Sequence, residues 1–151
     1  MFIFDILESD LAGNINGQLH LLFEGDIIDP HLSPDGNSIA FVSGRDLYCI
    51  PIPETDVDGA AKPLKLTSSE SAAPGVSYGI ADFVAQEEMD RYRGFWWSPD
   101  SQNIVLTEVD ESMIPEYTIL HQGKADPGHM ETHRYPFSGK ANPSVRLGVL
   151  K

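Results

Sequence analysis

The sequence predicts an all-β fold: a partial β-propeller of about two to three four-stranded antiparallel blades, with a short inserted helix. First, 13 glycines and 11 prolines fall at short intervals between runs rich in β-branched and aromatic residues. Second, a Ser-Pro-Asp turn occurs twice, at Ser33-Pro-Asp-Gly36 and Ser98-Pro-Asp-Ser101, and a strand-like run follows each. Third, the stretch 80–90 has helical rather than alternating spacing.

The predicted strands of the first half are short and joined by tight turns. Residues 1–7 and 18–23 form the first two runs, on either side of a Gly/Asn turn at 13–17. In the next turn Pro34 sets φ, while Asp35 and Gly36 tolerate positive φ. Four strands, the last three at 38–43, 47–52 and 63–67, are expected to make one blade across residues 29–67.

The second half repeats this pattern with additions. Runs at 95–97 and 103–109 match the first blade, and 116–120 is expected to take the place of 47–52. Runs at 132–136 and 144–150 follow. Ser33 and Ser98 lie further apart than the roughly 40–50 residues of common blades. The excess predicts an inserted loop and helix at 75–93, between two blades.

The chain is expected to be a fragment of a longer protein, because a closed propeller typically needs about 4–8 blades. We expect residues 1–151 to be part of one larger β-propeller domain. The sheet edges that such a fragment exposes predict pairing with a second copy, a homodimer.

Composition excludes several classes of function. The net charge is −13 and there is no basic run, which argues against nucleic-acid binding. No apolar stretch reaches the length of a membrane span, and the N-terminal residues lack the pattern of a signal peptide. The single cysteine, Cys49, excludes an internal disulfide and a cysteine-based metal cluster. We expect neither a metal nor another cofactor.

The strongest candidate site is a pair of carboxylates in the helical stretch. Ile80, Phe83 and Val84 share one face, and Glu87 and Glu88 occupy the next positions of that stripe. Two adjacent carboxylates suit the capture of a cation such as a protonated amine. Alternatively, the last turn leaves the core and the acids are solvated, with Arg91 as their partner.

Two further motifs receive weaker interpretations. Gly75-Val-Ser-Tyr-Gly79 matches the nucleophile elbow of α/β-hydrolases, with Asp126 and His129 or His133 in the right order. The preceding segment is polar, however, so a loop that leads into the helix is favoured. His129-Met-Glu-Thr-His133 places its acid wrongly for a zinc-binding His-Glu-x-x-His helix.

The chain resembles the dipeptidyl peptidase IV family of prolyl oligopeptidase-like serine peptidases, in its N-terminal β-propeller domain. Asp82-Phe-Val-Ala-Gln-Glu-Glu88 followed by Phe95-Trp-Trp-Ser-Pro-Asp100 carries most of the similarity. The resemblance is specific from about residue 75 onward and generic over 29–67. Supporting motifs are Thr107-Glu-Val-Asp110, Ile114-Pro-Glu-Tyr117, His133-Arg-Tyr-Pro136 and Lys140-Ala-Asn-Pro143.

The resemblance implies an exopeptidase that removes dipeptides from free N-termini, usually after proline or alanine. It implies that Glu87 and Glu88 bind the α-ammonium of the peptide substrate. The family's catalytic Ser, Asp and His lie in a C-terminal α/β-hydrolase domain that this chain lacks, so no catalytic residue is expected here and the fragment alone should be inactive. The family's substrate-contacting Arg has no counterpart in residues 22–32.

A bacterial cytoplasmic or periplasmic location is expected from the branches of the family that look most similar.

Two other interpretations of the function stay open. The main alternative is a non-enzymatic β-propeller scaffold for protein–protein interaction, which would have no need of the Glu87–Glu88 pair. The other is a free-standing serine hydrolase that uses Ser77.

Overall fold

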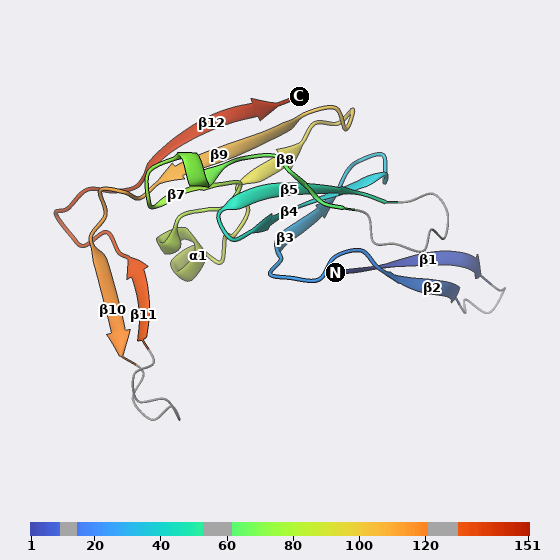
Figure 1. Ribbon diagram of the computed structural model, residues 1–151, viewed down its shortest axis with the longest axis horizontal. Helices are drawn as coiled ribbons and strands as arrows, with labels where there is room; N and C mark the ends of the chain where they lie inside the picture. Colours follow the sequence, from blue (N-terminus) through green and yellow to red (C-terminus); the bar gives the residue numbers. More distant parts are fainter. Residues whose placement is uncertain (10–14, 53–61, 121–129) are drawn as a thin grey trace.

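The computed structural model describes residues 1–9, 15–52, 62–120 and 130–151. These residues form two four-stranded antiparallel sheets and two separate two-stranded hairpins. Figure 1 shows the two sheets packed together, with helix α1 below them and the hairpins extending at either side. The chain therefore has the all-β architecture of a partial propeller. No helix in the described segments has the length and apolar character needed to cross a membrane.

The N-terminal hairpin pairs β1 (Phe2–Ser9) with β2 (Ile15–Leu21), in agreement with the first two predicted runs. The first sheet follows it and is the predicted first blade. Its strands β3 (Ile28–Leu32), β4 (Ser38–Ser43), β5 (Asp46–Pro51) and β6 (Leu64–Lys65) pair in sequence order.

The second sheet is centred on β9 (Ile104–Asp110). Two short strands share one edge of β9: β7 (Val76–Tyr78) pairs with residues 108–110, and β8 (Phe95–Trp97) pairs with residues 104–106. They occupy one strand position, which the intervening chain interrupts. The helix of segment 75–93 thus leaves from within a strand position of the second sheet rather than from a linker between the two sheets.

The expectation that residues 116–120 form the third strand of the second sheet is wrong. β10 (Glu116–Leu120) pairs instead with β11 (Met130–Arg134) in a separate hairpin, here called the arm. β12 (Ser144–Leu150) takes the third place and pairs with β9 along its whole length. The turn after β9 is anchored by Ile114, which is 1% exposed, so the chain leaves the sheet before β10 begins.

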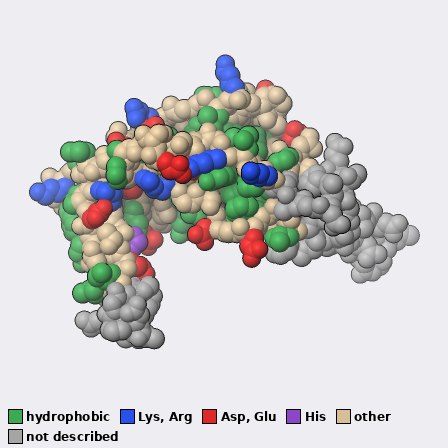
Figure 2. All heavy atoms as spheres, viewed as in Figure 1, with side chains coloured by type: hydrophobic (Ala, Val, Ile, Leu, Met, Phe, Trp, Pro, Cys, Tyr) green, Lys and Arg blue, Asp and Glu red, His purple; other side chains and the backbone are tan. Residues whose placement is uncertain are grey.

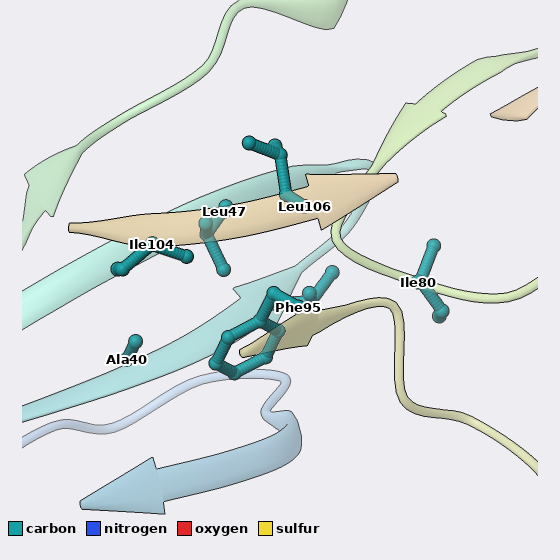
Figure 3. Packing of buried hydrophobic residues seen from close by; sticks show 7 residues of the cluster. Ala40, Leu47, Ile80, Phe95, Ile104 and Leu106 are labelled. Carbon is teal, nitrogen blue, oxygen red and sulfur yellow. The ribbon is translucent and has the colours of Figure 1, made fainter. Parts of the chain in front are cut away.

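The main hydrophobic core lies between the two sheets (Figure 3). A second cluster covers the other face of the first sheet, where the rings of Phe23 and Phe41 lie 4.9 Å apart. Consecutive residues of β4 point into different clusters, as alternation in a strand requires. The first sheet is therefore buried on both faces. The main cluster contains Ala40, Val42, Leu47, Ile80, Phe95, Ile104 and Leu106.

The two Ser-Pro-Asp turns have the same hydrogen bonds. In the first, Ser33 Oγ donates to Asp35 Oδ1 at 2.6 Å and accepts from the Ser38 amide at 3.0 Å. In the second, Ser98 Oγ donates to Asp100 and accepts from the Asn103 amide at 2.9 Å. This shared network confirms that the two sheets are repeats of one unit.

The repeated turns also touch each other. The Asp35 amide donates to Ser101 Oγ at 3.0 Å, so equivalent corners of the two sheets lie side by side. Serine and backbone donors lower the pKa of both Asp35 and Asp100, because hydrogen bonds to a carboxylate favour its charged form. The packing of equivalent corners is what a propeller repeat requires.

Candidate functional site

Helix α1 (Phe83–Met89) carries the predicted carboxylate pair and is shorter than the stretch 80–90. Asp82 caps its N-terminus by accepting from the Ala85 amide at 3.1 Å. At the other end Asp90 is left-handed, with φ 49°, and the Arg91 amide donates to the Ala85 carbonyl at 3.1 Å. The predicted stripe is therefore wrong at its start: Ile80 precedes the helix and is part of the main core.

The two chain segments that lead to and from α1 are held together as a stem. Ile80 and Arg93 form an isolated β-bridge, and the Ala81 amide donates to the Tyr92 carbonyl at 3.0 Å. Gly94 allows their close approach, since a Cβ there would lie 2.6 Å from the Ile80 nitrogen and from Thr107 Oγ1. The helix thus projects from a closed stem rather than from an open loop.

Glu87 and Glu88 lie in the last turn of α1, and both are exposed. Within the described part of the chain, no ion pair involves either carboxylate. Arg91, the partner of the alternative interpretation, lies 3.9 Å from Asp82 and donates to the Arg93 carbonyl instead. The C-terminus of a helix carries partial negative charge, which disfavours carboxylates there. A bound external cation would therefore offset the repulsion between the two carboxylates and the negative end of the helix.

The N-terminal end of α1 rests against the base of the arm. The ring of Phe83 stacks on that of His133, with centroids 4.5 Å apart, and meets Tyr135 edge-on at 6.4 Å. The Phe83 amide also faces Glu111 Oε1 at 3.5 Å. Burial raises the pKa of Glu111, and this amide and the Asp82 charge act on it more weakly, in opposite directions.

A polar network ties the stem to the first sheet. His31 Nε2 donates to Asp29 Oδ1 at 2.8 Å, and its Nδ1 accepts from Arg93 Nη2 at 2.8 Å. Arg93 Nε lies 3.7 Å from Asp29 Oδ2. Sequence analysis missed this network, because residues so far apart in the chain give no local signal. It brings a guanidinium against residues 22–32, which contain no Arg of their own.

The Gly-x-Ser-x-Gly motif at 75–79 does not form the elbow that its sequence matches. Ser77 lies in the middle of β7, opposite Val109, so residues 75–79 are neither a strand-to-helix elbow nor the loop favoured above. Asp126 and His129 lie outside the described residues. His133 and Ser77 both line a cleft of about 490 Å³ between the first sheet, α1 and the arm.

The surface around these elements carries mixed charge. Figure 2 shows acidic and basic side chains interspersed with hydrophobic ones on the face that it presents. Charges of both signs are mixed there instead of gathering into one field. The property that distinguishes Glu87 and Glu88 is therefore local: two neighbouring carboxylates on a braced helix.

Residues 2–151 match the family model described as the dipeptidyl peptidase IV N-terminal region. A probable dipeptidyl peptidase 4 of Trichophyton verrucosum is 32% identical over 99% of the chain and 19% of its own length. One of Emericella nidulans is 32% identical over 84% of the chain and 16% of its own length. The chain thus spans less than a fifth of these relatives.

The fold has a matching solved structure. The crystal structure of Porphyromonas gingivalis dipeptidyl peptidase 4 aligns with 98% of the chain, over 22% of its own length, with a TM-score of 0.70 and 24% identity. Nearly the whole chain therefore follows that fold. Taken with the family match over residues 2–151, these findings show that the chain belongs to the dipeptidyl peptidase IV family and corresponds to its N-terminal region.

Proposed function

We propose that Glu87 and Glu88 bind the α-ammonium of a peptide substrate in a serine-type dipeptidyl peptidase of which this chain is part. The observation that carries the proposal is the placement of two adjacent exposed carboxylates, without an ion-pair partner among the described residues, on a helix braced at its base. Charge-assisted hydrogen bonds to an ammonium are roughly twice as strong as neutral ones. The pair can therefore select a free N-terminus.

A fixed helix also explains removal of two residues at a time. If the ammonium is held at a constant distance from the scissile bond, only the second peptide bond reaches the catalytic groups. Peptides with longer N-terminal extensions would collide with α1. Under this proposal the catalytic Ser, Asp and His belong to a C-terminal α/β-hydrolase domain of the parent, and residues 1–151 alone have no peptidase activity.

The test is a cleavage assay on the full-length parent with Gly-Pro-linked and Ala-Ala-linked chromogenic amides, beside their N-acetylated forms. Cleavage of the free amines alone is the expected result, because acetylation removes the positive charge that the pair binds. Equal cleavage of both forms would contradict the proposal and indicate an endopeptidase or an unrelated hydrolase. Absence of any cleavage would favour the non-enzymatic scaffold.

The edges of the second sheet support the proposal of a homodimer for the isolated fragment. β12 has one strand neighbour, β9, among the described residues, and its side chains Val145, Leu147 and Val149 are 53%, 73% and 60% exposed. Unpaired edges with apolar side chains tend to pair with another chain. Size-exclusion chromatography with light scattering should show a dimer, and a monomer at high concentration would overturn this part of the proposal.

A further inference from the structure

The orientation of helix α1 depends on few contacts. The helix has seven residues, and Ala85 is the one that is buried. Its C-terminal turn, with Glu87 and Glu88, is exposed. A short helix with so little buried surface is positioned mainly by what holds its ends. One end continues into the stem, and the other begins at Phe83, which packs on the arm.

The arm presents a rigid surface to Phe83. Arg134 Nη1 donates to the Ile114 carbonyl at 2.8 Å, and its Nη2 donates to Glu116 at 2.9 Å. The Tyr135 amide donates to the Pro115 carbonyl at 3.1 Å. These bonds fix the end of β11 and the first residue after it to the turn after β9 and the start of β10. His133, next to Arg134 in β11, is therefore held in place when its ring meets Phe83.

The stack of Phe83 on His133 joins two segments, α1 and the arm, that leave the second sheet at different points. α1 departs from the edge position shared by β7 and β8, whereas the arm departs from the end of β9. The planes of the His133 imidazole and the Phe83 phenyl ring are 26° apart, which is close to parallel. The half-buried Glu111 lies beside the Phe83 amide. No sheet pairing links α1 to the arm in the described residues, so the stack on His133 and the edge-on contact of Phe83 with Tyr135 carry the connection between them.

We propose that His133 is a positioning residue for recognition of the substrate N-terminus. Its ring, stacked on Phe83, sets the tilt of α1 and so the location of Glu87 and Glu88. The inference rests on the function proposed above for the carboxylate pair. Small displacements of a binding group can cost up to about 100-fold in rate when the reacting geometry depends on it. Loss of a side contact should cost less, about five- to tenfold.

The experiment uses the full-length parent and a free-amine Gly-Pro chromogenic amide. His133→Ala removes the stack, whereas His133→Phe keeps an aromatic ring against Phe83. We expect His133→Ala to raise KM about five- to tenfold, with kcat changed less, and His133→Phe to restore most of the loss. Phe83→Leu, which removes the stack from the helix side, should repeat the effect of His133→Ala if that variant folds poorly.

A double-mutant cycle separates positioning from general damage. In a Glu87→Gln/Glu88→Gln background, His133→Ala should have little further effect, because it acts through those carboxylates. Thr118→Ala, an exposed position on the same arm, is the matched control and should leave KM unchanged in both backgrounds. Thermal unfolding of each variant verifies that the fold is retained.

Each outcome decides the inference. An equal loss in both backgrounds would mean that His133 acts through general stability, and the inference would be overturned. Normal KM for both His133→Ala and Phe83→Leu, beside a strong effect of the Glu87/Glu88 replacement, would overturn the inference and leave the proposed function intact. If the Glu87/Glu88 replacement itself had no effect, the proposed function would fail first and this inference with it.

Discussion

The two four-stranded sheets are built on one plan but differ in what they carry. Both turn at Ser-Pro-Asp with the same hydrogen bonds, and both contribute to the core between them. In the first sheet β3 is one strand, and β4 connects to β5 through a tight turn at Gly44. In the second, α1 interrupts the corresponding edge position and the arm occupies the connection from β9 to β12.

This difference separates scaffold from function. The shared turns and core form without α1 and the arm. Of the inserted segment and the arm, Ile80 is part of that core but few other residues are. Both features that we connect with substrate recognition, the carboxylate pair and its bracing contact to the arm, belong to the second sheet. The first sheet contributes the network that anchors the stem through Arg93.

The main core between the sheets, which contains Phe95, and the second cluster, which contains Phe41, should be equally sensitive to a cavity. Phe95 in the second sheet is 1% exposed and Phe41 in the first is fully buried. Replacing either by Ala should lower the free energy of unfolding by about 3–5 kcal/mol, because each leaves a large cavity. Chemical denaturation measures this change. Trp96→Ala, next to Phe95 but 41% exposed, is the control and should cost clearly less.

The two carboxylates of α1 should matter for activity, whereas exposed acids that precede the first sheet should not. Glu87→Gln with Glu88→Gln in the full-length parent should lower kcat/KM for free-amine substrates about 100-fold, since hydrogen bonds to charged groups contribute about 1.5–3 kcal/mol each. Steady-state kinetics measures the loss. Glu24→Gln with Asp26→Asn removes the same charge from exposed positions outside the insertion and should leave kcat/KM unchanged.

Removing the serine hydroxyl of the Ser-Pro-Asp turn should lower stability more in the first sheet than in the second. Ser33 is 3% exposed, and its hydroxyl is the partner of the Ser38 amide, so Ser33→Ala should cost about 1–3 kcal/mol of stability. Ser98 is less buried, and Ser98→Ala should cost about 1 kcal/mol or less because water can replace the hydroxyl. Equal losses in thermal unfolding would show that burial does not distinguish the two turns.

Two carboxylates should give opposite dependence of stability on pH. Burial tends to raise the pKa of Asp46, but hydrogen bonds from Ser69, Lys65 and Thr67 outweigh it and lower the pKa. Its contribution is present above the unfolded pKa near 3.8 and is lost as pH falls through the folded value. Burial raises the pKa of Glu111, so its contribution is present below about 4.5 and is lost as pH rises through the folded value.

The opposite pKa shifts of Asp46 and Glu111 lead to a pair of experiments. Asp46→Asn should lower stability at pH 7 and flatten the loss of stability below pH 4. Glu111→Gln should raise stability at pH 7, because it removes a desolvated charge and keeps an acceptor near the Phe83 amide. Unfolding midpoints between pH 3 and 8 measure both effects. Stabilisation by Asp46→Asn at neutral pH would contradict the assignment of its hydrogen-bond network.

The smallest effect is expected at the end of α1. Asp90 adopts φ 49°, a conformation that glycine accepts without steric cost. Asp90→Gly should therefore raise stability by up to about 1 kcal/mol and leave KM for free-amine substrates unchanged. A rise in KM would show that Asp90 takes part in binding the ammonium together with Glu87 and Glu88.

The local patterns of the chain predict much of the fold and of the candidate site. Ser-Pro-Asp turns followed by alternating strands indicated a repeated blade, because turn chemistry and strand periodicity both act over a few residues. The adjacent carboxylates of α1 were visible for the same reason. The family motifs around Asp82 and Phe95 identified the relatives that the comparisons then confirmed. None of these features depends on which strand lies beside which.

Tertiary structure decided the rest. Nothing local distinguishes residues 116–120 from 144–150 as the partner of β9, because both runs can form strands, and the choice depends on long-range pairing. The His31–Arg93 contact and the Phe83–His133 stack likewise join residues far apart in the chain. Local sequence patterns indicate which segments turn, extend or coil. Only the folded chain decided which of them meet, because packing depends on distances in space rather than on spacing along the chain.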